Sequence, residues 1–241
     1  MSPAYGYRAR IGYTCPVFVG EVFPFDFYRI VPDGVSLLLS TMSVWEGTEE
    51  EIKLSAEQSM RAAHEMAEAG ADIVVFGGVP VNFAASEHSV EEVVRRMEED
   101  YGVPVTASLL CQNAALKAVG ASKVLMMRSS SGTNVQHLEE VERLGCTVLE
   151  VLPLSQPVNR SGSLTADETL AQARELIQKH PEADTLHCAS PHWPMVANID
   201  ALEQEFGITV VTAGQAITWH ALRRCGIQDS IKGYGRLLRD L

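Results

Sequence analysis

The amino-acid sequence predicts an α/β protein made of two pseudo-symmetric half-domains, each a flavodoxin-like parallel sheet, with the active site in the cleft between them. Short β-branched segments alternate with longer segments of helical period, a pattern typical of repeated βα units around a parallel sheet. Two long stretches of the chain also repeat the same order of strand, turn and helix. The length of 241 residues suits one large α/β domain or two small ones.

The expected elements are short hydrophobic strands and amphipathic helices. The strands are expected over residues 9–13, 36–40, 72–76, 103–106, 123–127, 147–151, 185–188 and 209–211. The helices are expected over residues 48–68, 90–99, 112–119, 134–144, 166–178, 196–206 and 216–224. Ser89, with an acid three residues later, offers a side-chain cap for the second of these helices. Glycines stand where left-handed C-caps would end helices, at Gly70, Gly120, Gly145 and Gly226.

The internal repeat relates two βαβα stretches of the chain. Asp184 follows Asp72 by 112 residues and Gly226 follows Gly120 by 106 residues, so the register changes only in loops. Any two βαβα units share some features. The segments that end the two stretches, at Gly120 and Gly226, match more closely in sequence than a shared periodicity requires. The expected division is residues 1–120 plus a C-terminal tail of about 215–241 for the first half, and residues 121–214 for the second.

Charge and cysteine usage exclude several classes of protein. Nineteen Lys and Arg against 31 Asp and Glu give a net charge of −12, which would repel nucleic acid and anionic membranes. No apolar run approaches the roughly 18 residues of a membrane span, and the N-terminal segment lacks the core of a signal peptide, so we expect a cytoplasmic protein. The five cysteines are widely spaced and suggest free thiols. Neither metal-ligand spacing nor a nucleotide-binding loop is present, and we expect no metal and no cofactor.

A ligand site is expected at the carboxyl ends of the strands, where loops lead into helices. Cys188 ends a strand before a turn into a helix, where N–H groups and the helix dipole would stabilise a thiolate that shuttles protons. Free cysteines are also common packing residues, so position alone leaves both roles open. Cys15 also ends a strand, although Pro16 fits a structural turn equally well. His192 could act as an acid or base, whereas His187 alternates to the opposite face from Cys188 and is expected in the core.

Two further loops could bind a carboxylate. The glycine-rich turn at Gly78 and Val79 would let a ligand approach the backbone, or it simply makes the turn after a strand. Arg128 is followed by Ser129 and Ser130 at a strand-to-helix junction, where hydroxyl and N–H groups can form an anion pocket. Plain N-capping by one of these serines is the alternative.

With these features the sequence resembles the aspartate/glutamate racemase superfamily, and most of all its arylmalonate decarboxylase and maleate isomerase branch. The resemblance extends from residues 11–12 through residues 70–72 to the closing segment Gly-Tyr-Gly-Arg-Leu-Leu at 233–238. Racemases and maleate isomerases of this group use two cysteines, one on each face of the substrate. In this sequence the first position falls at Gly78 and only Cys188 matches, which is the pattern of the arylmalonate decarboxylases.

The resemblance implies a cofactor-independent decarboxylase of a substituted malonate-type acid, in which Cys188 protonates the enediolate intermediate. The N–H groups of Cys188 and Ala189 would bind the carboxylate. The substrate-binding residues would be Gly78, Val79, Arg128, Ser129, Ser130, Ala189 and Ser190. The chain departs from the decarboxylases at Val79 and Pro80, which replace two hydroxyl residues, and near Ser129, which replaces a tyrosine.

Two other functions remain open at this point. One is an isomerase or racemase, for maleate or for an amino acid or hydantoin, with Cys15 or His192 as a second acid or base. The other is a carboxylate-binding protein without turnover. Either would take a small carboxylic acid as its partner, and the oligomeric state stays open.

Overall fold

The computed structural model describes residues 5–129, 134–154 and 156–241. Its strands are β1 (Ala9–Val17), β2 (Val35–Val44), β3 (Ile73–Phe76), β4 (Val105–Ala107), β5 (Lys123–Ser129), β6 (Thr147–Leu154), β7 (Thr185–Cys188) and β8 (Thr209–Thr212). Its helices are α1 (Val22–Ile30), α2 (Glu49–Glu68), α3 (Val79–Ala84), α4 (Val90–Tyr101), α5 (Ser108–Val119), α6 (Asn134–Arg143), η1 (Val158–Ser163), α7 (Ala166–Lys179), η2 (Val196–Asn198), α8 (Ile199–Phe206), α9 (Ala213–Arg224) and α10 (Gly235–Asp240). Within the described ranges no helix has the length and apolar character needed to cross a membrane.

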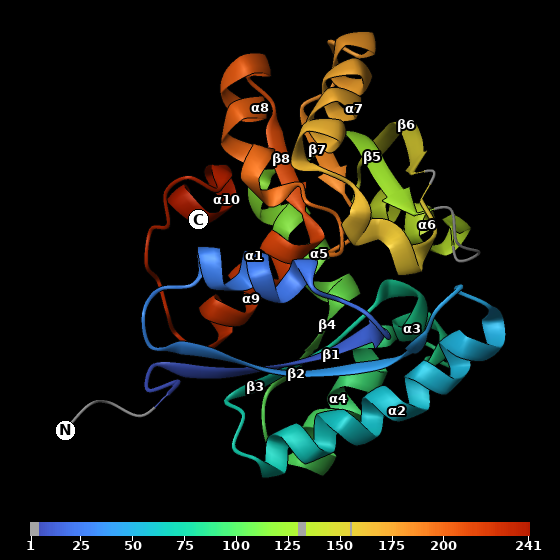
Figure 1. The fold of residues 1–241 in the computed structure, drawn as a ribbon, viewed down its shortest axis with the longest axis vertical. Coiled ribbons are helices and arrows are strands. Elements are labelled where there is room, and N and C mark those ends of the chain that lie inside the picture. Colours follow the sequence, from blue (N-terminus) through green and yellow to red (C-terminus); the bar gives the residue numbers. More distant parts are fainter. Residues whose placement is uncertain (1–4, 130–133, 155) are drawn as a thin grey trace.

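The strands form two parallel sheets of four, so the predicted α/β class and its two half-domains are confirmed. The sheet orders are β2-β1-β3-β4 and β6-β5-β7-β8, which are the same arrangement applied to each half of the chain. Figure 1 shows the first sheet at the bottom of the molecule and the second at the top. All eight predicted strands are present, most of them longer than expected.

The repeat has a physical basis in two equivalent aspartates that immediately precede the third strand of each half. The carboxylate of Asp72 accepts a hydrogen bond from the backbone N–H of Arg10 at 2.7 Å. The carboxylate of Asp184 accepts one from the backbone N–H of Lys123 at 2.8 Å. Each aspartate therefore fixes the start of the neighbouring strand. This shared role explains why the two sequences match at this position.

The helices between the sheets join the cores of both halves. In Figure 1 helices α1, α5 and α9 lie in the middle of the molecule, and α5 packs along α9. Leu116 of α5 belongs to the core cluster under the second sheet, although α5 follows the first sheet in sequence. Leu222 of α9 belongs to the core cluster of the first sheet, although α9 follows the second. The exact division near residues 120 and 215 stays a prediction, because these two helices cross between the halves.

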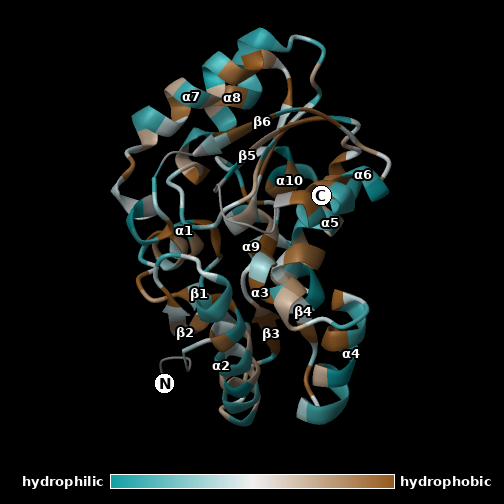
Figure 2. Cartoon of the chain, turned by 90° about the vertical axis from the view of Figure 1, so that its right-hand side faces the viewer, coloured by the Kyte–Doolittle hydropathy of each residue, from teal (hydrophilic) through white to brown (hydrophobic). Residues whose placement is uncertain are grey.

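The outer helices cover the sheets with amphipathic faces. Helix α2 buries Ile52, Ala56 and Ala63 against the first sheet and begins with a capping box at Thr48. In Figure 2 the outer surfaces of α2 and α7 carry teal, hydrophilic segments. The predicted cap at Ser89 is confirmed, because its hydroxyl accepts the N–H of Glu92 at 3.2 Å.

Three short α-helices, and the 3-10 helix η1, were not predicted. Helix α1 contains a proline and several aromatic residues and has no side-chain cap, so its pattern favoured no helix. Its buried residues Phe23, Phe27 and Ile30 nevertheless follow the helical period. Helix α3 has a proline in its first turn, which a helix tolerates because no hydrogen bond is lost there. The six-residue α10 buries Leu237 and Leu238 beneath the second sheet.

Candidate active site

A cavity of about 90 Å³ lies where the carboxyl ends of strands from both sheets meet. The carboxyl ends of β1, β2 and β5 line it, together with the segments that follow β3, β4 and β7. This volume holds roughly six to nine water molecules, which suits a small ligand. Of the predicted site residues, the cavity brings together Gly78, Val79, Arg128, Ala189, Ser190 and His192.

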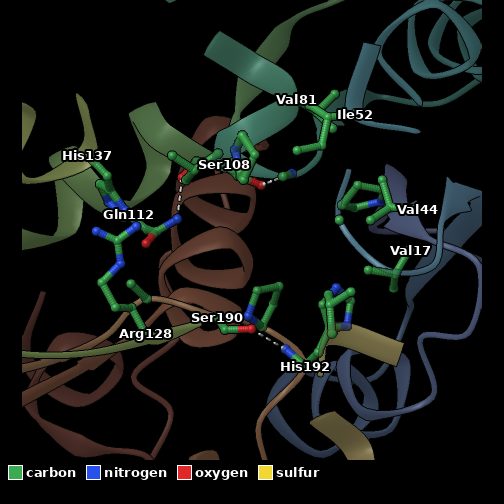
Figure 3. Close-up of a pocket in the computed structure, with 18 residues that line it drawn as sticks. Val17, Val44, Ile52, Val81, Ser108, Gln112, Arg128, His137, Ser190 and His192 are labelled. Atoms are coloured by element: carbon green, nitrogen blue, oxygen red, sulfur yellow. Dashed lines mark hydrogen bonds between the residues drawn. The ribbon is translucent and has the colours of Figure 1, made fainter. Parts of the chain in front are cut away.

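The cavity has an apolar wall and a polar end. The apolar wall is formed by Pro16, Val17, Val44, Ile52, Val79, Pro80, Val81 and Val158. The polar lining residues are Ser108, Gln112, Arg128, His137, Ser190 and His192. Figure 3 shows Gln112, Arg128 and His137 gathered at one end, with Val44 and Ile52 on the opposite side.

Arg128 is the one charged side chain among the described residues that line this cavity. It extends from β5 near the carboxyl end of that strand, and only 6% of the residue is exposed. Burial lowers the pKa of its guanidinium, but an arginine remains protonated at neutral pH. A buried cation in a mostly apolar cavity favours an anionic ligand, and the planar guanidinium matches a carboxylate.

Gln112 and His137 flank Arg128 and were not predicted as site residues. The amide nitrogen of Gln112 donates to the backbone carbonyl of Ser108 at 3.0 Å, which leaves its buried Oε1 without a hydrogen bond in the described structure. His137 is buried, and desolvation together with His187 and Arg128 lowers its pKa well below the usual value, so the ring is neutral. Gln112 lies near the start of α5 and His137 near the start of α6, and both helices begin at the cleft. This position could have marked both as site residues.

Backbone donors expected for the carboxylate are already used within the protein. The N–H of Gly78 donates to Oγ of Ser108 at 3.0 Å. The N–H of Ala189 donates to the carbonyl of Met127 at 2.8 Å, as an extension of the β5–β7 pairing. The Ala189 N–H is therefore engaged in strand pairing in this structure, and the predicted role of Ala189 in carboxylate binding stays a prediction.

Cys188 lies in the core and is not among the cavity-lining residues. Its side chain is fully buried in the cluster that includes Met127, Trp193 and Met195. Burial raises the pKa of the thiol to about 12, although a hydrogen bond from the backbone of Ser190 opposes the shift. The expected helix dipole is absent at this position, because α8 begins only at Ile199. These observations correct the predicted placement of the thiol, and its catalytic role stays a prediction.

Strand register explains this displacement. Phe76 pairs with Ala107 in the first sheet, and Cys188 pairs with Thr212 at the corresponding place in the second. Cys188 is therefore the counterpart of Phe76, and Ser190 is the counterpart of Gly78. Both Gly78 and Ser190 line the cavity, as the duplication predicts for the loops that follow β3 and β7.

The two alternative acid or base candidates lie next to each other. Sγ of Cys15 is 3.9 Å from Nε2 of His192. Burial raises the pKa of the Cys15 thiol to about 12 and lowers the pKa of His192 to about 4. Both groups are therefore neutral at pH 7, and only His192 lines the cavity.

Two predicted serines cannot be placed. The side chain of Ser129 and the whole of Ser130 lie outside the described residues. In the part of the chain that the structure describes, no three His, Cys, Asp or Glu residues are grouped as metal ligands would be.

The buried histidines predict an acid-sensitive fold. The pKa values of His187 and His192 are about 4 in the folded protein, because burial disfavours the charged ring, against 6.5 for an exposed histidine. A lowered folded pKa contributes stability that is complete above pH 6.5 and is lost as the pH falls towards 4. Urea unfolding should therefore show the free energy of unfolding decreasing over this range. His187→Gln should reduce the slope, and an unchanged slope would contradict a neutral buried His187.

A known protein family matches almost the whole of this chain. The sequence model described as arylmalonate decarboxylase matches residues 11–238. The chain belongs to the arylmalonate decarboxylase family. The maleate isomerase of Nocardia farcinica (strain IFM 10152) is 27% identical over 194 residues, which are 76% of this chain and 75% of that protein.

Solved structures show the same fold as this family member. The maleate isomerase Iso from Pseudomonas putida S16 superposes with a TM-score of 0.85 at 17% identity, covering 96% of this chain and 98% of that chain. An arylmalonate decarboxylase superposes with a TM-score of 0.80 at 21% identity, covering 96% of this chain and all (100%) of that one. The family and superfamily predicted from the sequence are thus confirmed, and the chain is an enzyme of the decarboxylase or isomerase type.

Proposed function

We propose that this member of the arylmalonate decarboxylase family decarboxylates a small malonate-type acid that carries an apolar substituent, without a cofactor. The observation that supports this most is the division of the cavity into an apolar wall and a polar end with one cation. Arg128 would hold the carboxylate that stays in the product. The substituent and the departing carboxylate would face the apolar wall.

This arrangement favours loss of CO2 for a physical reason. A carboxylate against apolar side chains loses its hydration, whereas the CO2 that it becomes is neutral and needs none. The electron pair of the broken C–C bond passes into an enediolate on the retained carboxylate. Negative charge therefore accumulates beside the guanidinium of Arg128, which lies at the polar end with His137.

Isomerisation is the alternative function, supported by the sequence match to a maleate isomerase. A structure of the Nocardia farcinica maleate cis-trans isomerase, 20% identical with a TM-score of 0.81, contains a covalently bound succinylcysteine intermediate. The described cavity wall of this chain includes no cysteine, and its single arginine matches one carboxylate better than two. Decarboxylation is therefore our first choice, and a carboxylate-binding protein without turnover is the third.

A panel of substrates distinguishes these functions. The protein is incubated in deuterated buffer with monosubstituted malonates, maleate, hydantoins and amino acids, and both CO2 release and deuterium uptake are measured. CO2 release from a substituted malonate is the expected result. Fumarate from maleate, or deuterium uptake without loss of carbon, would identify an isomerase or racemase. Binding without either change would identify a binding protein.

Cys188→Ser tests the sequence-based role of the thiol on the malonate that the panel identifies. Because the family resemblance implies that this thiol is the proton donor, we expect turnover to fall by orders of magnitude. We also expect the protein to lose about 1–2 kcal/mol of stability, because a hydroxyl is buried in the core there. Stopped-assay kinetics and urea unfolding on the same preparation measure the two effects. A loss of turnover smaller than about tenfold would show that Cys188, which lies in the core, is not the proton donor.

A further inference from the structure

We infer that the outer face of helix α1 is the contact surface of a homodimer, in which Asp26 of each copy pairs with Arg29 of the other. The surface formed by Phe25, Asp26, Tyr28 and Arg29 is named the α1 face. None of these residues lines the active-site cavity, so the inference does not depend on which reaction the cavity catalyses. In Figure 1 α1 and β2 lie on the side that faces the viewer, and in Figure 2 both lie at the left edge of the molecule.

Two aromatic side chains of the α1 face project into solvent. Phe25 is 63% exposed and Tyr28 is 56% exposed. They are three residues apart in the helix, so both rings belong to one surface. The hydroxyl of Tyr28 accepts the backbone N–H of Leu37 at 3.1 Å, which joins this surface to strand β2. Exposed aromatic side chains that gather on one face typically mark a protein–protein interface.

Strand β2 continues the same surface and lacks the usual protection of an edge strand. It lies at the edge of the first sheet, and its ten residues include no charged residue and no proline. The corresponding edge strand of the second sheet is β6, which contains Glu150 and Pro153. Native proteins protect exposed edges with charges or prolines, so this contrast indicates that β2, unlike β6, is covered in the assembled protein.

The carboxylate of Asp26 opens into a groove beside these aromatic rings. The groove has a volume of about 300 Å³ and lies between α1 and the segments that carry Ala166, Pro194 and Ala197. Only 7% of Asp26 is exposed, and its carboxylate makes no hydrogen bond or ion pair with any described residue. Neither carboxylate oxygen is completely enclosed, so the charged group itself contacts the groove.

This carboxylate needs a cation. Burial raises the pKa of Asp26 to about 6, although nearby Arg29 opposes the shift, so the group is mostly ionised at neutral pH. An ionised carboxylate that is largely buried without a hydrogen-bonded partner is unfavourable. The open groove therefore indicates a cationic side chain that enters from another molecule.

Arg29 supplies the matching charge without neutralising Asp26 of its own chain. Its guanidinium lies over the ring of Phe25, 5.3 Å from the ring centroid, and forms no ion pair within the described ranges. One copy thus offers a carboxylate and a guanidinium, three residues apart, that both lack a partner of opposite charge. A two-fold axis beside α1 sets each helix antiparallel to its copy and brings each Arg29 to the groove of the other.

The charge of the whole protein favours this surface for self-association. A net charge of −12 makes two copies repel each other in most orientations. On α1 the charges of Asp26 and Arg29 cancel, and β2 carries none, so two copies can approach here with little repulsion. Glu21 also lines the groove and adds to its attraction for an arginine. Two reciprocal ion pairs beside aromatic rings then fix the orientation of the dimer.

A mixture of two charge-reversed variants tests the pairing across the two-fold axis. Asp26→Lys sets lysine against arginine twice, and Arg29→Asp sets two carboxylates against each other twice, so each should raise the dimer Kd at least ~100-fold. An equimolar mixture should form a heterodimer with a Kd within about tenfold of the wild type, because both contacts again join opposite charges. Sedimentation equilibrium measures the Kd, and native mass spectrometry distinguishes the heterodimer by its mass.

Control variants separate this contact from general effects of charge and folding. Arg61→Asp makes the same change of charge on the exposed face of α2 and should leave the dimer Kd unchanged. Phe25→Ser should raise the Kd at least ~10-fold. Because Phe25 is largely exposed, this variant keeps the test available if Asp26→Lys does not fold. Circular dichroism and urea unfolding verify that each variant is folded.

Hydrogen exchange locates the contact in the wild-type protein. Protection gained between dilute and concentrated samples should be confined to α1 and β2. A wild type that stays monomeric at every concentration, or protection gained only on another surface, would overturn the inference. A dimer that is unaffected by Arg29→Asp, or a mixture of the two folded variants without heterodimer, would overturn it as well.

Discussion

Replacing Arg128 with glutamine is expected to lower kcat/KM for the malonate substrate by about 10³-fold, the upper range for loss of a group that stabilises a developing oxyanion. Arg128 is the one charged group among the described residues of the cavity lining, so its loss leaves the retained carboxylate without a counter-charge. The effect should appear in both kcat and KM, because the guanidinium holds the carboxylate before and during bond cleavage.

Two further variants make the Arg128 experiment specific. Arg128→Lys keeps the charge but loses the planar pair of donors, and should give an intermediate activity. Arg61→Gln removes an arginine from the exposed face of α2, where it pairs with Glu65, and should leave kcat/KM unchanged. Steady-state kinetics measure all three. Activity of Arg128→Gln within about threefold of the wild type would show that another group binds the carboxylate.

Gly77→Ala is expected to cost more than about 4 kcal/mol of stability, or to prevent folding. A Cβ at Gly77 would lie 1.8 Å from the backbone carbonyl oxygen of Thr14, and neither strand can move without breaking the pairing of β1 with β3. The N–H of Gly77 also donates to Oγ1 of Thr14 at 2.9 Å, which holds the ends of β1 and β3 together at the cleft.

Gly214→Ala is the matched control for this variant. In α9 the added Cβ would meet its nearest neighbours at 3.8–3.9 Å, which is ordinary contact, and alanine favours a helix by roughly 1 kcal/mol over glycine. The same substitution should therefore preserve or raise stability at residue 214. Urea unfolding of both variants gives the comparison, and a stable Gly77→Ala protein would refute the close approach of β1 and β3.

The parallel sheets could be predicted from sequence because local patterns determine them. Buried strands such as β3 consist of β-branched and aromatic residues, and the paired aspartates Asp72 and Asp184 mark the same structural position twice. Helix α1 escaped prediction because tertiary contacts with β1 and α9 stabilise it. Phe23 contacts Tyr13, with ring centroids 4.2 Å apart, and no local signal marks that contact.

Only part of the site could be predicted, because its other residues reach the cavity through tertiary packing. Loops that follow strands could be located, and Arg128, Ser190 and His192 lie in the cavity wall. The family resemblance matched Cys188 with Gly78, whereas the strand pairing aligns Cys188 with Phe76. A two-residue difference of this kind is invisible until the register is known. Gln112 reaches the cavity from α5, whose orientation depends on tertiary packing.

The crossed helices α5 and α9 make the two halves dependent on each other for folding. A fragment that ended near residue 120 would expose Leu116, whose apolar neighbours belong to the second sheet. A fragment of the second half would leave Leu222 exposed in the same way, because its neighbours belong to the first. The duplicated chain therefore behaves as a single cooperative unit rather than as two modules joined by a hinge. Substitutions in the loops at the cleft leave this helix packing intact. Replacing one half of the chain by a different half would not, because α5 or α9 of the remaining half would lose the core against which it packs.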